Sequence, residues 1–388
     1  MLKLGEVKIM KLGVDLSVLD ELEKLHPQYT YQGKEIEPFS FFSNHSKISV
    51  VRIRLWNHPY DENGNPYGGG TNDLNAFLRL AKKAKANNMK VILDFHYSDF
   101  WVDPSRQKLT KDWAKLNNYE EVKEALYKYT YNTLKTIKEN DIDLIAIQIG
   151  NEITHGMVWP YGINDGEFDE NKGGGFKGLS GLLKAGIKAS KEIYPHAKTI
   201  IHLEHSGSYD MQDWYFSNIL SNGVEFDVIG ESYYPYWHGP FNQFKECITK
   251  LKSKYQKEIW VVELGYEYID DGKTDFSEVT DAKEGDFIIG NINGRIPFAK
   301  SPEGQKDYIA TMLKICKEIG VGYVIYWEPA WIYMPNNGWA SDAGQRYCGL
   351  EPQPPYNVWM NETLFNLKGE ANPAIDVFTQ QFVDKIKL

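Results

Sequence analysis

Residues 144–160 read L-I-A-I-Q-I-G-N-E-I-T-H-G-M-V-W-P, and this stretch decides the fold. Its first six residues form a short apolar run rich in Ile, which predicts a strand buried on both faces of a parallel sheet. The run stops at Gly150, and Asn151 and Glu152 follow directly. In sheets flanked by helices, ligands bind at the carboxyl ends of the strands. We therefore expect this amide and this carboxyl group to lie at a functional edge.

A second run of the same kind, I-W-V-V-E, ends on Glu263. A glycosidase needs two carboxyl groups at one site, and strand ends of one barrel would supply them. The plainer alternative is that each glutamate is a solvated loop carboxylate. The paired strand-end placement favours the functional interpretation. Because Glu152 and Glu263 are far apart in the sequence, only the fold can bring them together.

Eight strand-like runs alternate with helical ones along the chain. The predicted strands are residues 7–17, 50–56, 90–96, 144–149, 199–203, 226–234, 259–263 and 322–327. The predicted helices are residues 19–24, 74–87, 118–140, 179–194, 211–222, 242–255, 302–319 and 373–386. The connections after the strands are longer than those before them. This pattern predicts an α/β fold, a single (β/α)₈ TIM barrel over residues 1–388 with extended loops at its carboxyl face.

The composition excludes several classes of protein. The chain has 388 residues and a net charge of −10, with no long basic block, so nucleic acid and membrane are not expected partners. No apolar run approaches the roughly 18 residues of a membrane span, so a soluble protein is expected. The three cysteines are far apart and fit neither a disulfide framework nor a metal-ligand spacing. The amino-terminal residues lack a signal-peptide pattern, which leaves a cytoplasmic protein or a secreted one without its leader.

Arg52 and Arg54 lie two residues apart in one predicted strand, so their side chains share a face. A buried guanidinium group must find carboxylates, because an unpaired buried charge is very costly. Either arginine could hold Glu263 ionised, and we favour Arg54 for support of the site because it is nearer the strand end. The alternative is a plain salt bridge inside the barrel.

Aromatic residues are abundant, with 11 Trp and 25 Tyr. Five tryptophans lie at or just beyond predicted strand ends: Trp56, Trp101, Trp237, Trp327 and Trp331. A single Trp is a core residue by default, but several at one barrel mouth favour stacking platforms for a sugar chain. We expect Trp327 to form the floor of the subsite where cleavage occurs.

The motifs, taken in order, resemble those of the glycoside hydrolase family 53 endo-β-1,4-galactanases. The resemblance rests on G-V-D-L-S, V-R-I-R-L-W-N-H-P, L-D-F-H-Y-S-D-F-W-V-D-P, I-G-N-E-I-T-H-G-M-V-W-P-Y-G, D-V-I-G-E-S-Y-Y-P-Y-W-H-G, W-V-V-E and Y-W-E-P-A-W. It implies hydrolysis of galactan or type I arabinogalactan with retention, Glu152 as acid/base and Glu263 as nucleophile. Residues 167–175 and 265–301 depart from the family pattern.

The resemblance also implies roles for the neighbouring residues. Asn151 is placed to hydrogen-bond the sugar 2-hydroxyl, and Tyr234 or His238 to orient the nucleophile. His96 and Asp99 would form a wall of the sugar site. The alternatives are a barrel glycosidase acting on another β-linked hexan, such as mannan or glucan, and a non-catalytic glycan-binding barrel.

Metal sites are not favoured. A zinc site at D-F-H fails because no second His stands at ligand spacing. Relatives can hold a structural calcium near the acidic loop, whose residues are Asp270, Asp271, Asp275, Asp281, Glu284 and Asp286. A charge-rich loop is usually solvated, so we expect no calcium there and no cofactor for the chemistry.

Overall fold

The computed structural model describes residues 10–269, 298–354, 357, 359–379 and 382. Its centre is a closed barrel of parallel strands in the order β1-β12-β11-β10-β9-β6-β5-β4. The strands are β1 (Lys11–Asp15), β4 (Ile48–Leu55), β5 (Lys90–Phe95), β6 (Leu144–Ile149), β9 (Lys198–Leu203), β10 (Val228–Tyr233), β11 (Glu258–Leu264) and β12 (Tyr323–Tyr326). Every predicted strand is present, and the predicted TIM barrel is confirmed.

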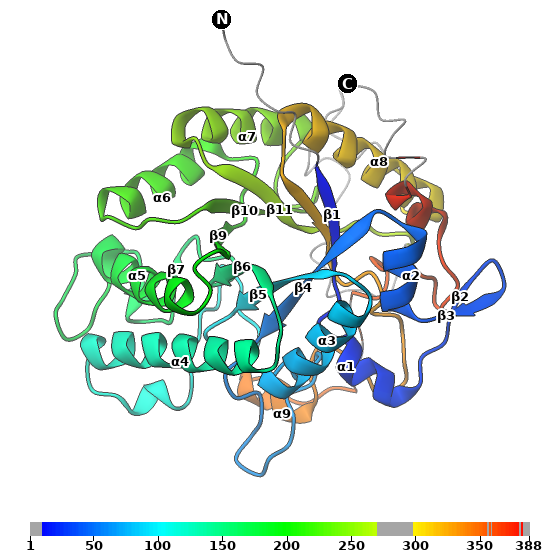
Figure 1. Ribbon diagram of the computed structural model, residues 1–388. Helices are drawn as coiled ribbons and strands as arrows, with labels where there is room; N and C mark the ends of the chain where they lie inside the picture. Colours follow the sequence, from blue (N-terminus) through cyan, green and yellow to red (C-terminus); the bar gives the residue numbers. More distant parts are fainter. Residues whose placement is uncertain (1–9, 270–297, 355–356, 358, 380–381, 383–388) are drawn as a thin grey trace, which may run out of the picture.

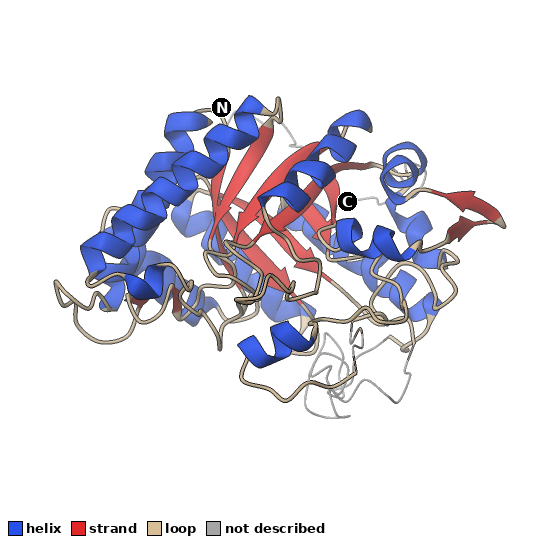
Figure 2. Ribbon diagram, turned by 90° about the horizontal axis from the view of Figure 1, so that it is seen from below, coloured by secondary structure: helices blue, strands red, loops and turns tan. Residues whose placement is uncertain are grey.

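Helices surround the barrel, as Figure 1 shows along its axis and Figure 2 from below. They are α1 (Leu19–Leu22), α2 (Pro38–His45), α3 (Leu74–Ala86), α4 (Tyr119–Glu139), α5 (Gly175–Ile193), α6 (Tyr209–Ser221), α7 (Phe241–Tyr255), α8 (Pro302–Ile319) and α9 (Asp342–Tyr347), with 3-10 turns η1 (Glu23–Leu25), η2 (Trp113–Lys115) and η3 (Pro373–Phe378). None of the helices in the described part of the chain is both long and apolar enough to cross a bilayer.

Two short hairpins and two helices, α2 and α9, lie where the sequence predicted loops. Strands β2 (Tyr29–Tyr31) and β3 (Lys34–Ile36) pair antiparallel, as do β7 (Gly156–Met157) and β8 (Gly162–Ile163). Helix α2 begins with Pro38, and the Glu37 side chain caps it by accepting from Ser40 N. Its phenylalanines are buried, so packing stabilises a helix that its polar flanks did not indicate.

The last predicted helix, residues 373–386, is different in the structure. Its first part is the 3-10 turn η3 (Pro373–Phe378), and most of the remainder lies outside the described residues. Pro373 suits the first position of such a turn, because proline has no N–H to leave unsatisfied there.

The interior of the barrel changes character along its axis. Apolar side chains fill one layer: Val50, Ile92, Ala146, Ile200, Val228, Trp260, Val262 and Ile325. Nearer the carboxyl ends of the strands, buried polar residues replace them, including Arg52, Asp94, Gln148, His202 and Ser232. A register shift between Glu231 and Ser232 pairs Ser232 with Glu263 across β10 and β11. Such irregularities re-aim side chains, and this one lies at the carboxyl face.

Candidate active site

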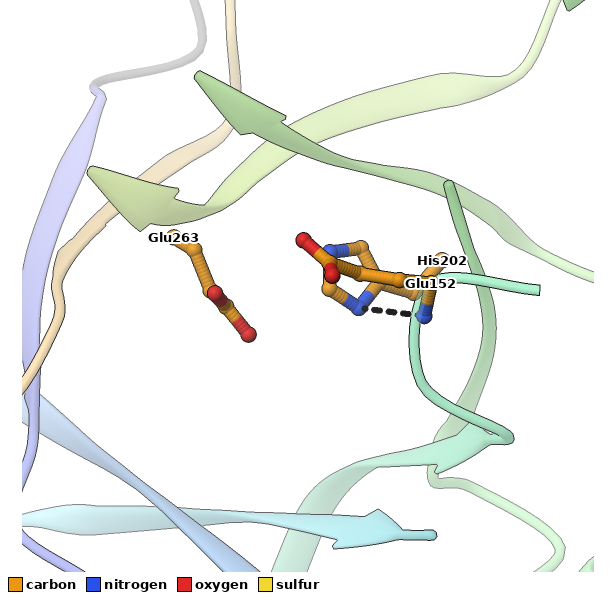
Figure 3. Close-up of side chains that lie close together, drawn as sticks. All are labelled: Glu152, His202 and Glu263. Carbon is orange, nitrogen blue, oxygen red and sulfur yellow. Dashed lines mark hydrogen bonds between the residues drawn. The ribbon is translucent and has the colours of Figure 1, made fainter. Parts of the chain in front are cut away.

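Glu152 and Glu263 meet at the carboxyl face of the barrel. Glu152 stands three residues beyond the end of β6, and Glu263 lies near the end of β11. One carboxylate oxygen of each, together with a ring nitrogen of His202, lies within 4.8 Å of the others (Figure 3). That separation suits a carboxyl pair that acts directly on one bond, because a pair about 6.5–9.5 Å apart would leave room for a water molecule between them.

Glu152 is held by the backbone and by neighbouring strands. Its φ is 48°, a left-handed conformation that is uncommon outside glycine, and Gly150 before it has a φ of 85°. Its Oε1 accepts a hydrogen bond of 2.7 Å from Ser232 Oγ. Burial and the negative charge of Glu263 raise the pKa of Glu152 well above its ordinary value. A raised pKa favours the protonated carboxyl group, which suits a general acid.

Glu263 lies between a cation and a hydroxyl group. Arg52 Nη2 is 3.0 Å from its Oε1, and Tyr234 Oη donates to its Oε2 over 3.1 Å. Burial raises the pKa of Glu263 to about 7, while Arg52 and the Tyr234 hydrogen bond act against that rise. Of the two glutamates, Glu263 is therefore the one whose surroundings favour the carboxylate, which suits a nucleophile.

Arg52 connects four strands of the barrel. Its guanidinium group donates to Asp15 on β1 and Asp94 on β5, each over 2.9 Å, and to Asn151 Oδ1 over 2.9 Å. Its Nε donates to Gln148 on β6. The side chain is 1% exposed, so its charge is compensated entirely by these partners and Glu263. Asn151 also donates from Nδ2 to Val102 O.

Arg54 does not support Glu263, and our preference for it was wrong. Its Nη1 lies 2.5 Å from Glu328 Oε1, and its Nη2 donates to Gly69 O. Its guanidinium group lies 4.1 Å from the centre of the Trp101 ring. Because Arg54 is further along β4 than Arg52, it pairs with Glu328, which follows β12, rather than reaching Glu263. Arg54 is thus a partner in packing and in a buried ion pair.

The tryptophans divide into buried and accessible ones. Trp56 and Trp331 are completely buried, so a stacking role does not fit them. Trp331 stacks on Trp101 with 6.2 Å between centroids. Trp327, the residue after β12, is 9% exposed, while Trp237 is 39% exposed and meets Tyr234 edge to face. Trp237 is thus the most accessible ring of the five predicted platforms.

His96, Asp99 and His238 are buried within the protein. Trp56 Nε1 donates to His96 Nδ1, so His96 Nε2–H faces Asp94 Oδ2 at 3.1 Å. His96 therefore belongs to the Arg52 network. Asp99 accepts from two backbone amides, those of His58 and Lys111, and His238 Nδ1 accepts from Tyr234 N. These contacts indicate that Asp99 and His238 shape the loops around the site.

Sequence reasoning missed several residues of this site. The most important are Asp94, Gln148, His202, Ser232 and Glu328, all of them buried. Four of them, all except Glu328, lie inside predicted strands. Each lies two residues after a residue of the apolar layer in the same strand, except Ser232, which lies four residues after one. Because side chains alternate in a strand, that spacing would have placed them on the inner face.

The same centre contains the residue types of a small metal site. Glu152, His202 and Glu263 form a group within the described residues whose spacing would admit an ion. Each is already engaged, with Ser232 or Arg52 as partners, and a cationic guanidinium beside Glu263 disfavours a second cation. The acidic loop considered for calcium lies outside the described residues.

Comparisons with known proteins agree with this geometry. Residues 11–378 match the sequence profile of Glycosyl hydrolase family 53. The endo-β-1,4-galactanase of Bacillus subtilis (strain 168) is 32% identical, over 94% of this chain and 84% of that protein. The catalytic domain of this family from Ignisphaera aggregans superposes with a TM-score of 0.83 at 34% identity, covering 97% of this chain and 96% of that one. A structure of fungal β-1,4-galactanases gives a TM-score of 0.72 at 25% identity, covering 95% and 98%. The chain therefore belongs to glycosyl hydrolase family 53.

Proposed function

We propose that this chain is a retaining endo-β-1,4-galactanase, which hydrolyses β-1,4-galactosidic bonds in galactan and type I arabinogalactan. The observation that carries the proposal is the carboxylate pair, Glu152 and Glu263, with oxygens within 4.8 Å at the carboxyl face of the barrel. Retaining glycosidases place these groups about 5–5.5 Å apart. The names of the galactanase relatives supply the substrate class.

The first step forms a covalent intermediate. A carboxylate oxygen of Glu263 attacks the anomeric carbon, and the bond to the leaving oxygen breaks as Glu152 donates its proton to that oxygen. Arg52 and Tyr234 hold Glu263 ionised and oriented for the attack. The sugar 2-hydroxyl group lies nearest Asn151, whose side chain Arg52 fixes.

The second step releases the product. Glu152, now a carboxylate, takes a proton from a water molecule, whose oxygen attacks the anomeric carbon and displaces Glu263. Two inversions at one carbon retain its configuration. The residues need no cofactor for either step, and residues 1–388 act as one catalytic domain. Trp237 and Trp327 serve as platforms for the sugar chain.

The test is a product time course on linear β-1,4-galactan, with mannan and β-glucan in parallel. We expect reducing ends from galactan alone, with the β-anomer appearing first by NMR. E263Q is expected to lose turnover on every substrate, and E152Q to spare the first step with activated aryl leaving groups. E231Q is the control, because Glu231 is a buried glutamate bonded to Gln212 on α6, outside the site. Release of the α-anomer, or turnover confined to mannan or glucan, would refute the proposal.

A further inference from the structure

The side chain of Glu152 is held by a set of hydrogen bonds that begins at its own backbone. Its N–H donates to His202 Nδ1 over 3.4 Å, drawn as the dashed line in Figure 3. His202 Nε2 lies 2.8 Å from Ser232 Oγ, and Ser232 Oγ donates to Glu152 Oε1 over 2.7 Å. These hydrogen bonds connect Glu152, which follows β6, with His202 on β9 and Ser232 on β10, and they end at the side chain of the same Glu152.

The direction of these bonds follows from what each atom can do. A backbone N–H only donates, so His202 Nδ1 is the acceptor and the hydrogen of the neutral ring stands on Nε2. Nε2–H then donates to Ser232 Oγ, and the single hydrogen of that hydroxyl group points to Glu152. Gln148 Nε2, which can only donate, lies 3.0 Å from the same Nδ1 and supports this assignment, while Asn151 Oδ1, also 3.0 Å away, accepts a hydrogen from Arg52.

The imidazole stays neutral in this position. Burial and the nearby positive charge of Arg52 hold the pKa of His202 well below its ordinary value. A neutral ring keeps one nitrogen as donor and one as acceptor, which is what the path from backbone to carboxyl group requires. Both His202 and Ser232 are completely buried.

We propose that His202 and Ser232 are positioning residues, which fix the orientation of the Glu152 carboxyl group by directing a hydroxyl hydrogen at its Oε1. The inference rests on the proposed role of Glu152 as acid and base. With Oε1 committed to Ser232, the transferable proton belongs on Oε2. Neither His202 nor Ser232 is required to touch the substrate.

This arrangement also sets the proton affinity of Glu152. Burial, Glu263, the nearby Glu204 and Asp103 all raise its pKa, and the hydrogen bond from Ser232 lowers it. Tyr234 stands close by as a neutral phenol, because burial and Glu263 raise its own pKa. The Ser232 hydroxyl group therefore acts against burial and the three carboxylates, and its removal should shift the pKa of Glu152 further upward.

The test is a carboxyl titration of the full chain without substrate. In protein labelled with ¹³C at glutamate side chains, the Glu152 signal is identified by its loss in E152Q. We expect S232A to raise the pKa of Glu152 by about one unit, the effect of one lost charge-assisted hydrogen bond. The basic limb of kcat/KM on galactan, which reports the acid in the free enzyme, should move upward equally.

Matched variants separate positioning from folding. Ser206 is buried and donates to Ser232 O over 2.6 Å, so S206A removes a hydroxyl group next to the path but outside it. S206A and S232T are expected to leave the Glu152 pKa at its wild-type value. S232C keeps the side-chain shape but offers only a weak S–H donor, so it should shift the pKa as S232A does, and it replaces S232A if that variant does not fold.

The outcomes distinguish this inference from the proposed function. An unchanged Glu152 pKa in S232A and S232C, with folded protein in both, would overturn the positioning role. An equal shift in S206A would also overturn it, because the effect would then be a general response to a lost buried hydroxyl group. A chain inactive on galactan would refute the proposed function, but it would leave the titration result standing.

Discussion

Arg52 Nη2 lies 3.0 Å from Glu263 Oε1, and this buried ion pair joins the second barrel strand to the seventh. The same guanidinium group contacts Asp15 and Asp94. Removing it would leave Asp94 and Glu263 without their guanidinium partner, and Asp15 with only Arg54 Nη1 at 3.8 Å. The proposed nucleophile is therefore held by a group that also holds the barrel interior together. One side chain, Arg52, therefore serves both the chemistry of Glu263 and the stability of the fold.

Replacing Arg52 with Lys should weaken catalysis while retaining the charge. A lysine is a point charge and does not reproduce the fork that reaches several acceptors at once. We expect kcat to fall by roughly 10²-fold, the order reported for loss of one preorganised donor. The weaker pairing should raise the pKa of Glu263, so the acidic limb of kcat/KM should move to higher pH. In R54K that limb should stay in place, and an equal shift there would contradict the assignment.

Removing the Tyr234 hydroxyl group should affect the nucleophile more mildly. Y234F deletes one hydrogen bond of 3.1 Å to Glu263 and leaves the ring in place. Because that bond lowers the pKa of Glu263, its loss should shift the acidic limb upward and reduce kcat by about tenfold, or roughly 1.4 kcal/mol. Stopped-flow measurement of the glycosylation step would detect this. An unchanged pH profile would show that the contact is only packing.

A buried carboxyl group near the site should make stability depend on pH. Neither oxygen of Glu362 has a hydrogen-bond partner among the residues that the structure describes, and burial, followed by the charge of Glu263, raises its pKa to about 8. The folded state then binds a proton that the unfolded state releases near pH 4.5, so the protein loses stability as pH rises from there toward 8.

Replacing Glu362 with Gln should remove that dependence. Glutamine has nearly the same shape and cannot ionise, so E362Q should be more stable than the wild type at pH 7 by roughly 3 kcal/mol, an upper figure for one such group. At pH 4.5 the two should differ little. Denaturant unfolding at both values measures this, and a difference of equal size at both would mean that the effect is unrelated to ionisation.

Two tryptophan variants should separate binding from folding. Trp237 is accessible, so W237A should raise KM for polysaccharide by roughly 2–10-fold, as expected for a lost stacking contact of about 0.5–1.5 kcal/mol, with little change in kcat. Trp331 is buried and donates to Asn337, so W331A should lower the free energy of unfolding by about 3–5 kcal/mol. If W237A instead lowered the free energy of unfolding and W331A instead raised KM, the stacking platform would not be Trp237.

The barrel could be predicted because each of its strands and helices can be recognised in a short window of sequence. Each strand is a short apolar run bounded by polar residues, and most are followed by an amphipathic helix, as α5 follows residues 144–149. Helix α2 was missed because its stability comes from burial of phenylalanines against β4 and not from its own sequence pattern. Tertiary packing of this kind leaves little trace in a short window of sequence.

The site was only partly predictable for a similar reason. Glu152 and Glu263 lie at or just beyond the ends of their strands, and this paired placement singled them out in the sequence. The choice between Arg52 and Arg54 depended on how far along the barrel axis each guanidinium group reaches, which strand stagger sets and sequence does not state. A role for His202 and Ser232 can be recognised only from their closeness to Glu152, which depends on how three strands are placed in the fold.

Both glutamates of the proposed pair stand on the frame of the barrel, one within β11 and one three residues beyond the end of β6. Cleavage and substrate choice are thus carried by separable parts of the chain. To obtain activity on longer or branched glycans, the loops at the carboxyl face would be exchanged for those of other barrels, and the ends of the strands would be left unchanged.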